Sequence, residues 1–161
     1  MPATAVIVQL PAEALPKLSS AIAALVPQDT SRFMAALELG YLAASADGLD
    51  AKERDALATT LEHVTGIGHD HDAFAAHFAD LDAAVATLGR RERLARTAAE
   101  FETDDLRENA IRFAALVAMC DGTLREHELE VLNEAGGHFQ WSAEKIHGLV
   151  TDAAARVRGE R

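Results

Sequence analysis

The sequence predicts an all-α protein, folded as a compact single-domain bundle of seven or eight helices. Apolar residues make up 49% of the 161 residues but aromatic residues only 5%, so alanine and leucine supply most of the core. Apolar side chains recur at spacings of three and four along most of the chain, which is the helical period. Runs rich in valine, isoleucine and aromatic residues, which are typical of strands, are nearly absent.

The chain is expected to divide into an N-terminal segment with the first helix, residues 1–28, and a helical domain, residues 29–158. Residues 4–8 are compatible with either a short strand or a helix leader. The first helix is predicted by a stripe of apolar residues at helical spacing: Leu15, Leu18, Ile22 and Leu25. No linker is long enough to require a second domain.

Turn and capping residues bound each further helix. The expected helices cover residues 31–46, 50–65, 70–88, 90–101, 104–120, 124–135 and 142–157. The helix at 31–46 is apolar nearly all round, which predicts a central position. Gly136-Gly137 is expected to end the helix that begins near residue 124.

Charge and cysteine content narrow the possible partners and location. The net charge of −11 favours cations or basic partners and disfavours nucleic acid. Cys120 is the only cysteine, so no disulfide can form within one chain, which suits a reducing cytosol. The N-terminus lacks the basic start of a signal peptide, and no apolar run reaches the ~18 residues of a membrane span. A cytoplasmic protein without a transmembrane segment is expected.

Two segments repeat one pattern, in which an apolar helix meets Asp-Gly and a second helix follows. The copies cover about residues 31–66 and 104–137. When Asp47 is aligned with Asp121, Leu42 meets Leu116 and Leu39 meets Phe113. Beyond the glycines, one extra residue in the second copy aligns three further pairs: Leu49 with Leu124, Glu53 with Glu128, and Leu57 with Leu132. The pattern indicates an internal duplication.

The acidic residues at these two corners have two interpretations. In the first, Asp47, Glu53, Asp121 and Glu128 supply carboxylate oxygens to Ca²⁺ or Mg²⁺, with weaker candidates at Asp50 and Glu126. The corners are not EF-hands. Val117 and Met119 stand where the first two side-chain ligands of such a loop would be, and Arg54 replaces the last ligand of the first copy.

In the second interpretation, the acidic residues stabilise helix starts. Asp50 with Glu53, and Thr123 with Glu126, have the spacing of a capping box. Carboxylates in a first helical turn also interact favourably with the helix dipole. Spacing alone does not separate capping from cation binding.

At these corners the chain resembles the TerB-like family, the tellurite-resistance protein B group. The shared pattern is Ala-x-x-Asp-Gly, then an apolar residue, then Glu and Leu one to two turns later. It stands here at residues 44–57 and 118–132. The resemblance covers about residues 30–155. It departs from the family pattern at Glu53, because the first copy lacks one residue after Asp-Gly.

This resemblance implies a compact helical fold and a non-catalytic cytoplasmic protein of the stress response, of the tellurite-resistance type. It also implies divalent-cation binding by the acidic residues and work within a protein complex that is linked to the membrane. A homo-oligomer is compatible with it. The alternative is a structural interaction module, whose acidic residues cap helices and contact a basic partner without metal.

Two further clusters are candidate sites. Arg90, Arg91, Arg93 and Arg96 form a basic cluster that could bind a partner, although a solvated helix face has the same composition. His63, His69, His71 and His77 would have to converge to make a metalloenzyme site, and their spacing matches no closed zinc site. No phosphate-binding glycine loop or nucleophile elbow occurs, so no enzymatic activity is expected.

Overall fold

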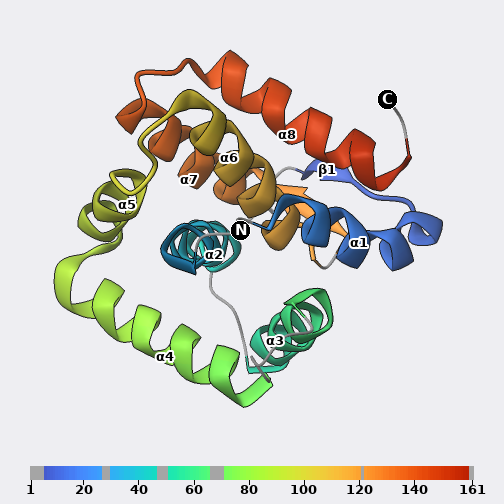
Figure 1. The fold of residues 1–161 in the computed structure, drawn as a ribbon, viewed down its shortest axis with the longest axis horizontal. Coiled ribbons are helices and arrows are strands. Elements are labelled where there is room, and N and C mark those ends of the chain that lie inside the picture. Colours follow the sequence, from blue (N-terminus) through green and yellow to red (C-terminus); the bar gives the residue numbers. More distant parts are fainter. Residues whose placement is uncertain (1–5, 27–29, 47–50, 66–70, 121, 160–161) are drawn as a thin grey trace.

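The computed structural model describes residues 6–26, 30–46, 51–65, 71–120 and 122–159, except for the side chains at 30, 51, 53, 56, 63–65 and 71–73. Within these ranges it contains eight α-helices, one short 3-10 helix and a two-stranded sheet. The prediction of an all-α bundle is confirmed. Figure 1 shows α2 end-on near the centre, with the other helices arranged around it.

The element bounds follow the expected order. The α-helices are α1 (Leu15–Leu25), α2 (Thr30–Ala44), α3 (Ala51–Thr65), α4 (His71–Leu88), α5 (Arg90–Ala98), α6 (Asp104–Ala118), α7 (Glu126–His138) and α8 (Ala143–Val157). The remaining elements are β1 (Val6–Gln9), η1 (Ala12–Ala14) and β2 (Thr123–Arg125).

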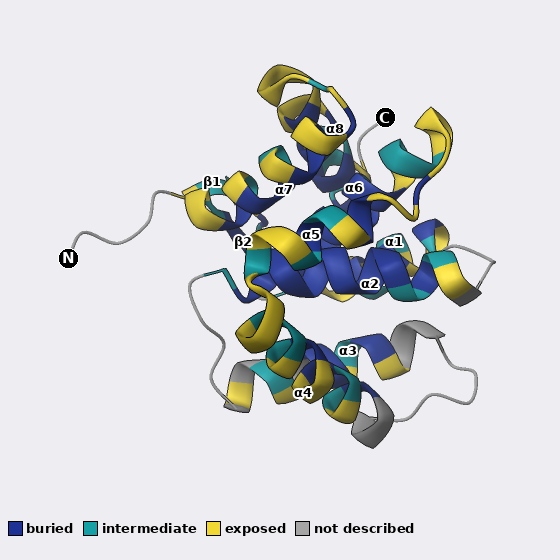
Figure 2. Ribbon diagram, turned by 90° about the vertical axis from the view of Figure 1, so that its left-hand side faces the viewer, coloured by how far each residue is buried: buried dark blue, intermediate teal, exposed yellow. Residues whose placement is uncertain are grey.

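Helix α2 is the central helix, as its all-round apolar character predicts. Every residue from 35 to 45 is buried, and α2 is dark blue along most of its length in Figure 2. Its neighbours are α6, α5 and α7. A helix that is apolar on all sides is stable only when it is enclosed in this way.

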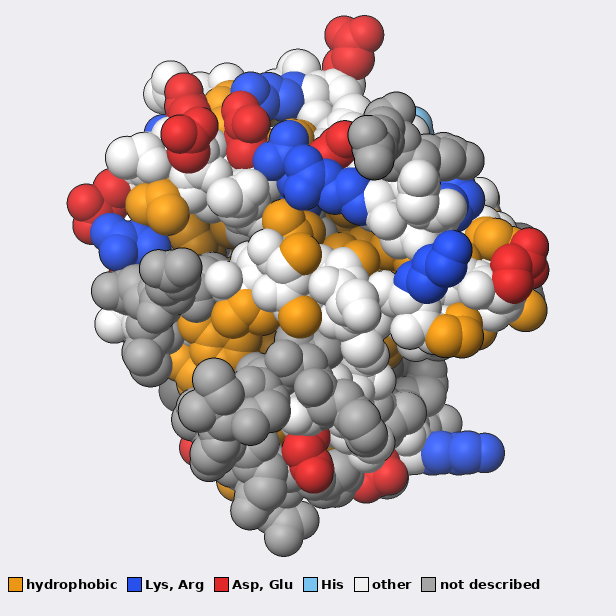
Figure 3. All heavy atoms as spheres, turned by 45° about the vertical axis from the view of Figure 1, so that its right-hand side comes forward, with side chains coloured by type: hydrophobic (Ala, Val, Ile, Leu, Met, Phe, Trp, Pro, Cys, Tyr) orange, Lys and Arg blue, Asp and Glu red, His pale blue; other side chains and the backbone are white. Residues whose placement is uncertain are grey.

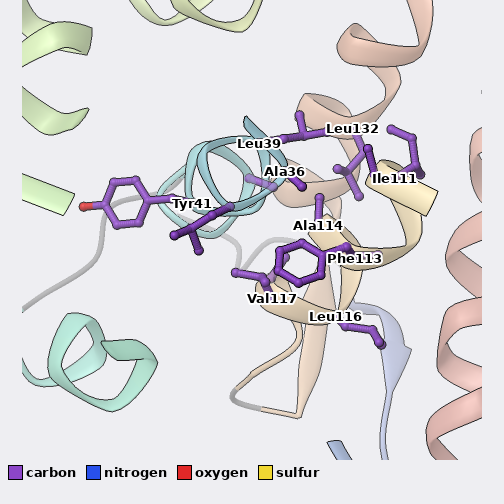
Figure 4. Close-up of a cluster of buried hydrophobic side chains, with 14 of the residues drawn as sticks. Ala36, Leu39, Tyr41, Ile111, Phe113, Ala114, Leu116, Val117 and Leu132 are labelled. Atoms are coloured by element: carbon purple, nitrogen blue, oxygen red, sulfur yellow. The ribbon is translucent and has the colours of Figure 1, made fainter. Parts of the chain in front are cut away.

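The most extensive packing in the molecule is between α2 and α6. A Cβ atom added to Gly40 would lie 2.8 Å from Cβ of Val117 and 3.3 Å from Cα of Ala114. The missing side chain therefore lets the two helices approach closely at this crossing. Figure 4 shows Ala36 and Leu39 of α2 on the side of the helix that faces α6 and α7.

Tyr41 points to the opposite side of α2, away from this cluster (Figure 4). Its ring stacks on Phe78 of α4, with 4.5 Å between centroids. Its hydroxyl donates a 2.8 Å hydrogen bond to Asp82 of α4, and Arg54 of α3 forms a 2.7 Å ion pair with the same carboxylate. Burial is the main reason why the pKa of Tyr41 is raised to about 12. Tyr41 thus connects α2 to α4, and Arg54 connects α3 to the same carboxylate.

The N-terminal segment forms a strand, one of the two alternatives for residues 4–8. Strand β1 pairs antiparallel with β2, which directly follows the second Asp-Gly corner. The backbone N–H of Leu10 also donates to the carbonyl of Gly122 at 2.8 Å. Local pattern could not identify this pairing, because its partner lies more than one hundred residues away along the chain.

The expected end of α7 at Gly136-Gly137 is wrong, since the helix continues to His138. A Cβ atom on Gly136 would lie 2.6 Å from Ile146 of α8, so this glycine allows close helix packing. A helix tolerates an internal glycine at a cost of about 1 kcal/mol relative to alanine.

The helix bounds support the internal duplication. Helices α2 and α6 each contain 15 residues. The alignment of Asp47 with Asp121 makes their bounds equivalent. Thr30 corresponds to Asp104, and Ala44 corresponds to Ala118. With the extra residue in the second copy, the first residues of α3 and α7 also coincide. The two repeated helices are the pair that packs together at the centre.

On the face shown in Figure 3, acidic and basic side chains are interspersed, with hydrophobic side chains between them. The net charge of −11 does not form one continuous acidic surface on this face. None of the helices in the described ranges combines the length and apolar character needed to cross a membrane.

The close approach at Gly40 gives a stability prediction. Gly40→Ala is expected to lower the free energy of unfolding by about 1–3 kcal/mol, because the new methyl group overlaps Val117. Gly148→Ala in α8 is the matched control, since nothing lies within 4 Å of its added Cβ, and it should raise stability by about 0.5–1 kcal/mol. Urea unfolding measures both changes. Equal stability of the two variants would contradict the packing described here.

Candidate functional site

The second acidic corner is held by the N-terminal strand. Gly122 has φ +93°, a conformation that side-chain-bearing residues rarely adopt. The bond from Leu10 fixes its carbonyl, and Leu15 of α1 lies 3.1 Å from the position of an added Cβ. Asp121, the candidate ligand of this corner, lies outside the described residues.

Glu128, the second candidate of this corner, is buried with 7% of its surface exposed. One carboxylate oxygen accepts a 2.8 Å hydrogen bond from the backbone N–H of Arg125, which is the N-cap of α7. Glu128 therefore caps this helix in the manner of a capping-box glutamate. The expected box of Thr123 with Glu126 is wrong, because Thr123 belongs to β2 and Glu126 is the first, exposed residue of α7.

The first acidic corner is approached by an arginine from α5. One guanidinium nitrogen of Arg90 lies 2.5 Å from the carbonyl oxygen of Leu42, and the other lies 3.2 Å from that of Ser45. These bonds satisfy carbonyl groups at the C-terminal end of α2 and place a cation at the negative end of the helix dipole. The candidates Asp47 and Asp50 lie outside the described residues, as does the side chain of Glu53.

A pocket of about 260 Å³ opens where α2 ends. Ala46, the residue before Asp47, lines it together with His127, Glu130 and Glu134 of α7. These three α7 residues share one face of the helix, because their spacings are three and four. Residues that sequence analysis did not select, Glu130 and Glu134, thus lie beside the last described residue of the first corner.

The carboxylates of this pocket are candidate ligands for a cation. The carboxylates of Glu130 and Glu134 are ligands that Ca²⁺ and Mg²⁺ prefer, and no ion pair with the other described residues engages them. Arg90 lines the same pocket, but its guanidinium is directed to the carbonyl oxygens of α2. Within the described ranges, no three His, Cys, Asp or Glu side chains converge as a metal site. The donors fit a hard cation in kind, and a complete set needs residues of the corner itself.

The basic cluster of α5 divides into two parts. Arg90 and Arg93 make bonds within the protein, Arg90 to α2 carbonyls and Arg93 to Glu38. Arg91 is exposed, and Arg96 is exposed but forms a 3.3 Å ion pair with Glu92 in the same helix. Two of the four arginines therefore connect α5 to α2.

Glu38 is a buried carboxylate with 6% of its surface exposed. Arg93 contacts both carboxylate oxygens, at 2.7 Å through Nη2 and 2.6 Å through Nε, and the Thr97 hydroxyl donates to one of them. The hydrogen bond to this carboxylate raises the pKa of Arg93 above its ordinary value. A lone glutamate within the apolar stretch 33–44 was the available sequence signal, since a charge there needs a partner.

These residues line the floor of a second cavity, about 550 Å³ in volume, between α2 and α5. Helix α2 contributes residues 31, 34, 35 and 38, α5 contributes 93, 96 and 97, and Glu100 follows the end of α5. Each set is one helix face. The helices run antiparallel, because Glu38 meets Arg93 and Thr97 while Arg32 lies 3.9 Å from Glu102. We call this cavity the α2–α5 cleft.

His77 of α4 lines the side of the α2–α5 cleft. Its Nε2 atom is enclosed and makes no hydrogen bond in the described structure. Burial lowers the pKa of His77, against smaller raising effects of Glu38 and Asp80, while Arg93 lowers it further. The other histidines of the proposed cluster, at 63, 69 and 71, have side chains outside the described set, so their convergence stays untested.

Cys120 is partly buried next to the core at the end of α6.

Comparison of the chain with models of known families, with curated proteins and with solved structures gave no match. The interpretation of these sites therefore depends on the chemistry of the residues themselves.

The buried imidazole predicts a pH dependence of stability. Because the pKa of His77 is lower in the folded than in the unfolded protein, the unfolded state takes up the proton first as pH falls below about 6.5. Stability should decrease over this window, and the decrease should be smaller in His77→Phe. Urea unfolding at pH 7.5 and pH 5.5 measures it. His147→Phe, at an exposed position of α8, should retain the full decrease, and identical behaviour of both variants would contradict the prediction.

Proposed function

We propose that this chain is a TerB-like, non-catalytic protein that binds a divalent cation, Ca²⁺ or Mg²⁺, at its acidic helix corners. The observation that carries the proposal is the pocket at the end of α2, where Glu130 and Glu134 of the second repeat lie beside Ala46 of the first. Asp47 is the next residue in the sequence. In this proposal Asp47 supplies the donor of the first repeat, and Glu130 and Glu134 supply those of the second.

The electrostatics of α7 support this proposal. Glu130 and Glu134 are four residues apart on one face, and like charges at this spacing destabilise a helix. No basic side chain of the described ranges forms an ion pair with either one. A bound cation would remove this repulsion. Glu130 and Glu134 join Asp47, Glu53, Asp121 and Glu128 as proposed ligands.

The proposed role is in a stress response of the tellurite-resistance type, within a protein complex linked to the membrane. The acidic charge of the chain suits basic segments of such partners. The exposed Arg91 and Arg96 are a second proposed contact, for an acidic partner. We place the protein in the cytoplasm, in keeping with its single cysteine.

A second candidate function is an interaction module without metal. The bond between Glu128 and the N-cap backbone of α7 favours it, because this acidic residue has a structural role that needs no ion. In that case the corner acids stabilise helix starts, and the acidic α7 surface contacts a basic partner directly.

Cation titration distinguishes these candidates. Isothermal titration calorimetry with CaCl₂ and MgCl₂ on the full chain should give saturable binding. Glu130→Gln/Glu134→Gln and Asp47→Asn/Asp121→Asn should each abolish or strongly weaken it. The control Glu13→Gln/Glu144→Gln removes the same number of charges at exposed positions away from the pocket and should bind normally.

The two candidates predict opposite changes of the melting temperature in metal-free buffer when the carboxylates are removed. Without an ion, clustered carboxylates repel, so Glu130→Gln/Glu134→Gln should raise the melting temperature. Saturating cation should add about 2.7 kcal/mol to the stability of the unmodified protein at one hundred times Kd. Absence of saturable binding, together with a lower melting temperature of Asp47→Asn/Asp121→Asn, would favour the module without metal and reject the cation site.

A further inference from the structure

The α2–α5 cleft has the construction of a ligand site and is separate from the proposed cation site. Its volume of about 550 Å³ is within the range of small-molecule pockets, roughly 300–1,000 Å³. Figure 1 shows α5 beside α2, with α4 running below them. Its lining combines the apolar Met34 and Ala35 of α2 with polar and charged side chains of both helices.

The floor of the cleft is a rigid charged group. Glu38 is held by Arg93 and Thr97, and such buried ion pairs often stabilise a protein no better than apolar residues of similar volume would. A buried ion pair that borders a cavity therefore favours a role in binding. Its effect is to fix the guanidinium of Arg93 in one orientation.

Several polar groups of the cleft remain available to a ligand. Nη2 of Arg93 donates to Glu38, while Nε lies 2.6 Å from the other carboxylate oxygen without hydrogen-bond geometry, and none of the bonds of Arg93 to described residues uses Nη1. Arg96, one turn further along α5, uses only Nε for Glu92. The two arginines are three residues apart, so they offer N–H donors from adjacent turns of one helix face.

We propose that the α2–α5 cleft binds a small molecule that bears an oxyanion, either a carboxylate or a phosphate. The oxyanion accepts hydrogen bonds from Nη1 of Arg93 and from the guanidinium of Arg96, which matches the planar donors of arginine. Met34 and Ala35 on the opposite helix face contact the apolar part of the molecule.

Glu100 sets the selectivity of this site. It lies one turn beyond Arg96 at the rim and is exposed, with no ion pair in the described structure. Its carboxylate repels the oxyanion and weakens binding of multiply charged ligands. The overall net charge of −11 acts in the same direction, so the test is made at about 0.15 M salt, where charges beyond roughly 8 Å are screened.

The test uses sodium butyrate and inorganic phosphate as separate probes at constant ionic strength. NMR spectra of the ¹⁵N-labelled full chain, including arginine Nε–H signals, should show saturable shifts at Arg93 and Arg96. Arg96→Gln should weaken binding by about tenfold or more, because a charge-assisted hydrogen bond to the oxyanion is lost. Glu100→Gln should strengthen it.

Arg156→Gln is the matched control. Arg156 also pairs with a carboxylate one turn earlier, Asp152 at 3.2 Å, and is similarly exposed on α8, so its loss should leave the affinity unchanged. Saturation by butyrate alone identifies a carboxylate ligand, by phosphate alone a phosphate ligand, and by both a general oxyanion site. Shifts that do not saturate with either probe, equal weakening by both arginine substitutions, or unchanged binding by Glu100→Gln would overturn the proposal. Cation binding at the end of α2 is unaffected by any of these results.

Discussion

The structure depends on the close approach of α2 to α6 at Gly40. Because Gly40 has no side chain, Val117 of α6 fits closely against α2. The two repeated helices therefore pack together, and α6 covers one side of α2. Polar side chains add specific contacts between α2 and its other neighbours. Tyr41 bridges to α4, and Glu38 meets an arginine of α5. A larger residue at the crossing would overlap Val117 and Ala114 and force α2 and α6 apart.

Both candidate sites are consequences of this arrangement. The α2–α5 cleft has one face of α2 as its wall, with Glu38 as the buried end. The pocket with Glu130 and Glu134 lies where the same helix ends, and Arg90 secures the carbonyl groups there. The position of α2 therefore determines which donors meet at each site. The two sites are nevertheless distinct in charge, since one gathers carboxylates and the other offers guanidinium groups.

Sequence periodicity predicted the all-α fold and most helix bounds, because each depends on local spacing of apolar residues. It could not predict the pairing of β1 with β2, or the selection of Arg90 and Arg93 for contacts with α2, since these depend on segments far apart in sequence. The capping box of α7 consists of Arg125 and Glu128, two residues later than the expected pair of Thr123 and Glu126. The difference arises because the strand before α7 sets where the helix starts. Glu38 was identifiable in principle, as a charge within an apolar stretch, but its partner was not.

Native-state hydrogen exchange in increasing urea tests the central position of α2 most directly. Amides at 36–44 and 110–118 should exchange only through global unfolding, with one common free energy that is the highest in the protein, because these helices bury each other. Amides of β1, a short strand with exposed ends, should exchange through local opening at lower free energy. Exchange of the α2 amides at a free energy well below that of α6 would contradict the role of α2 as the element on which the fold and both sites depend.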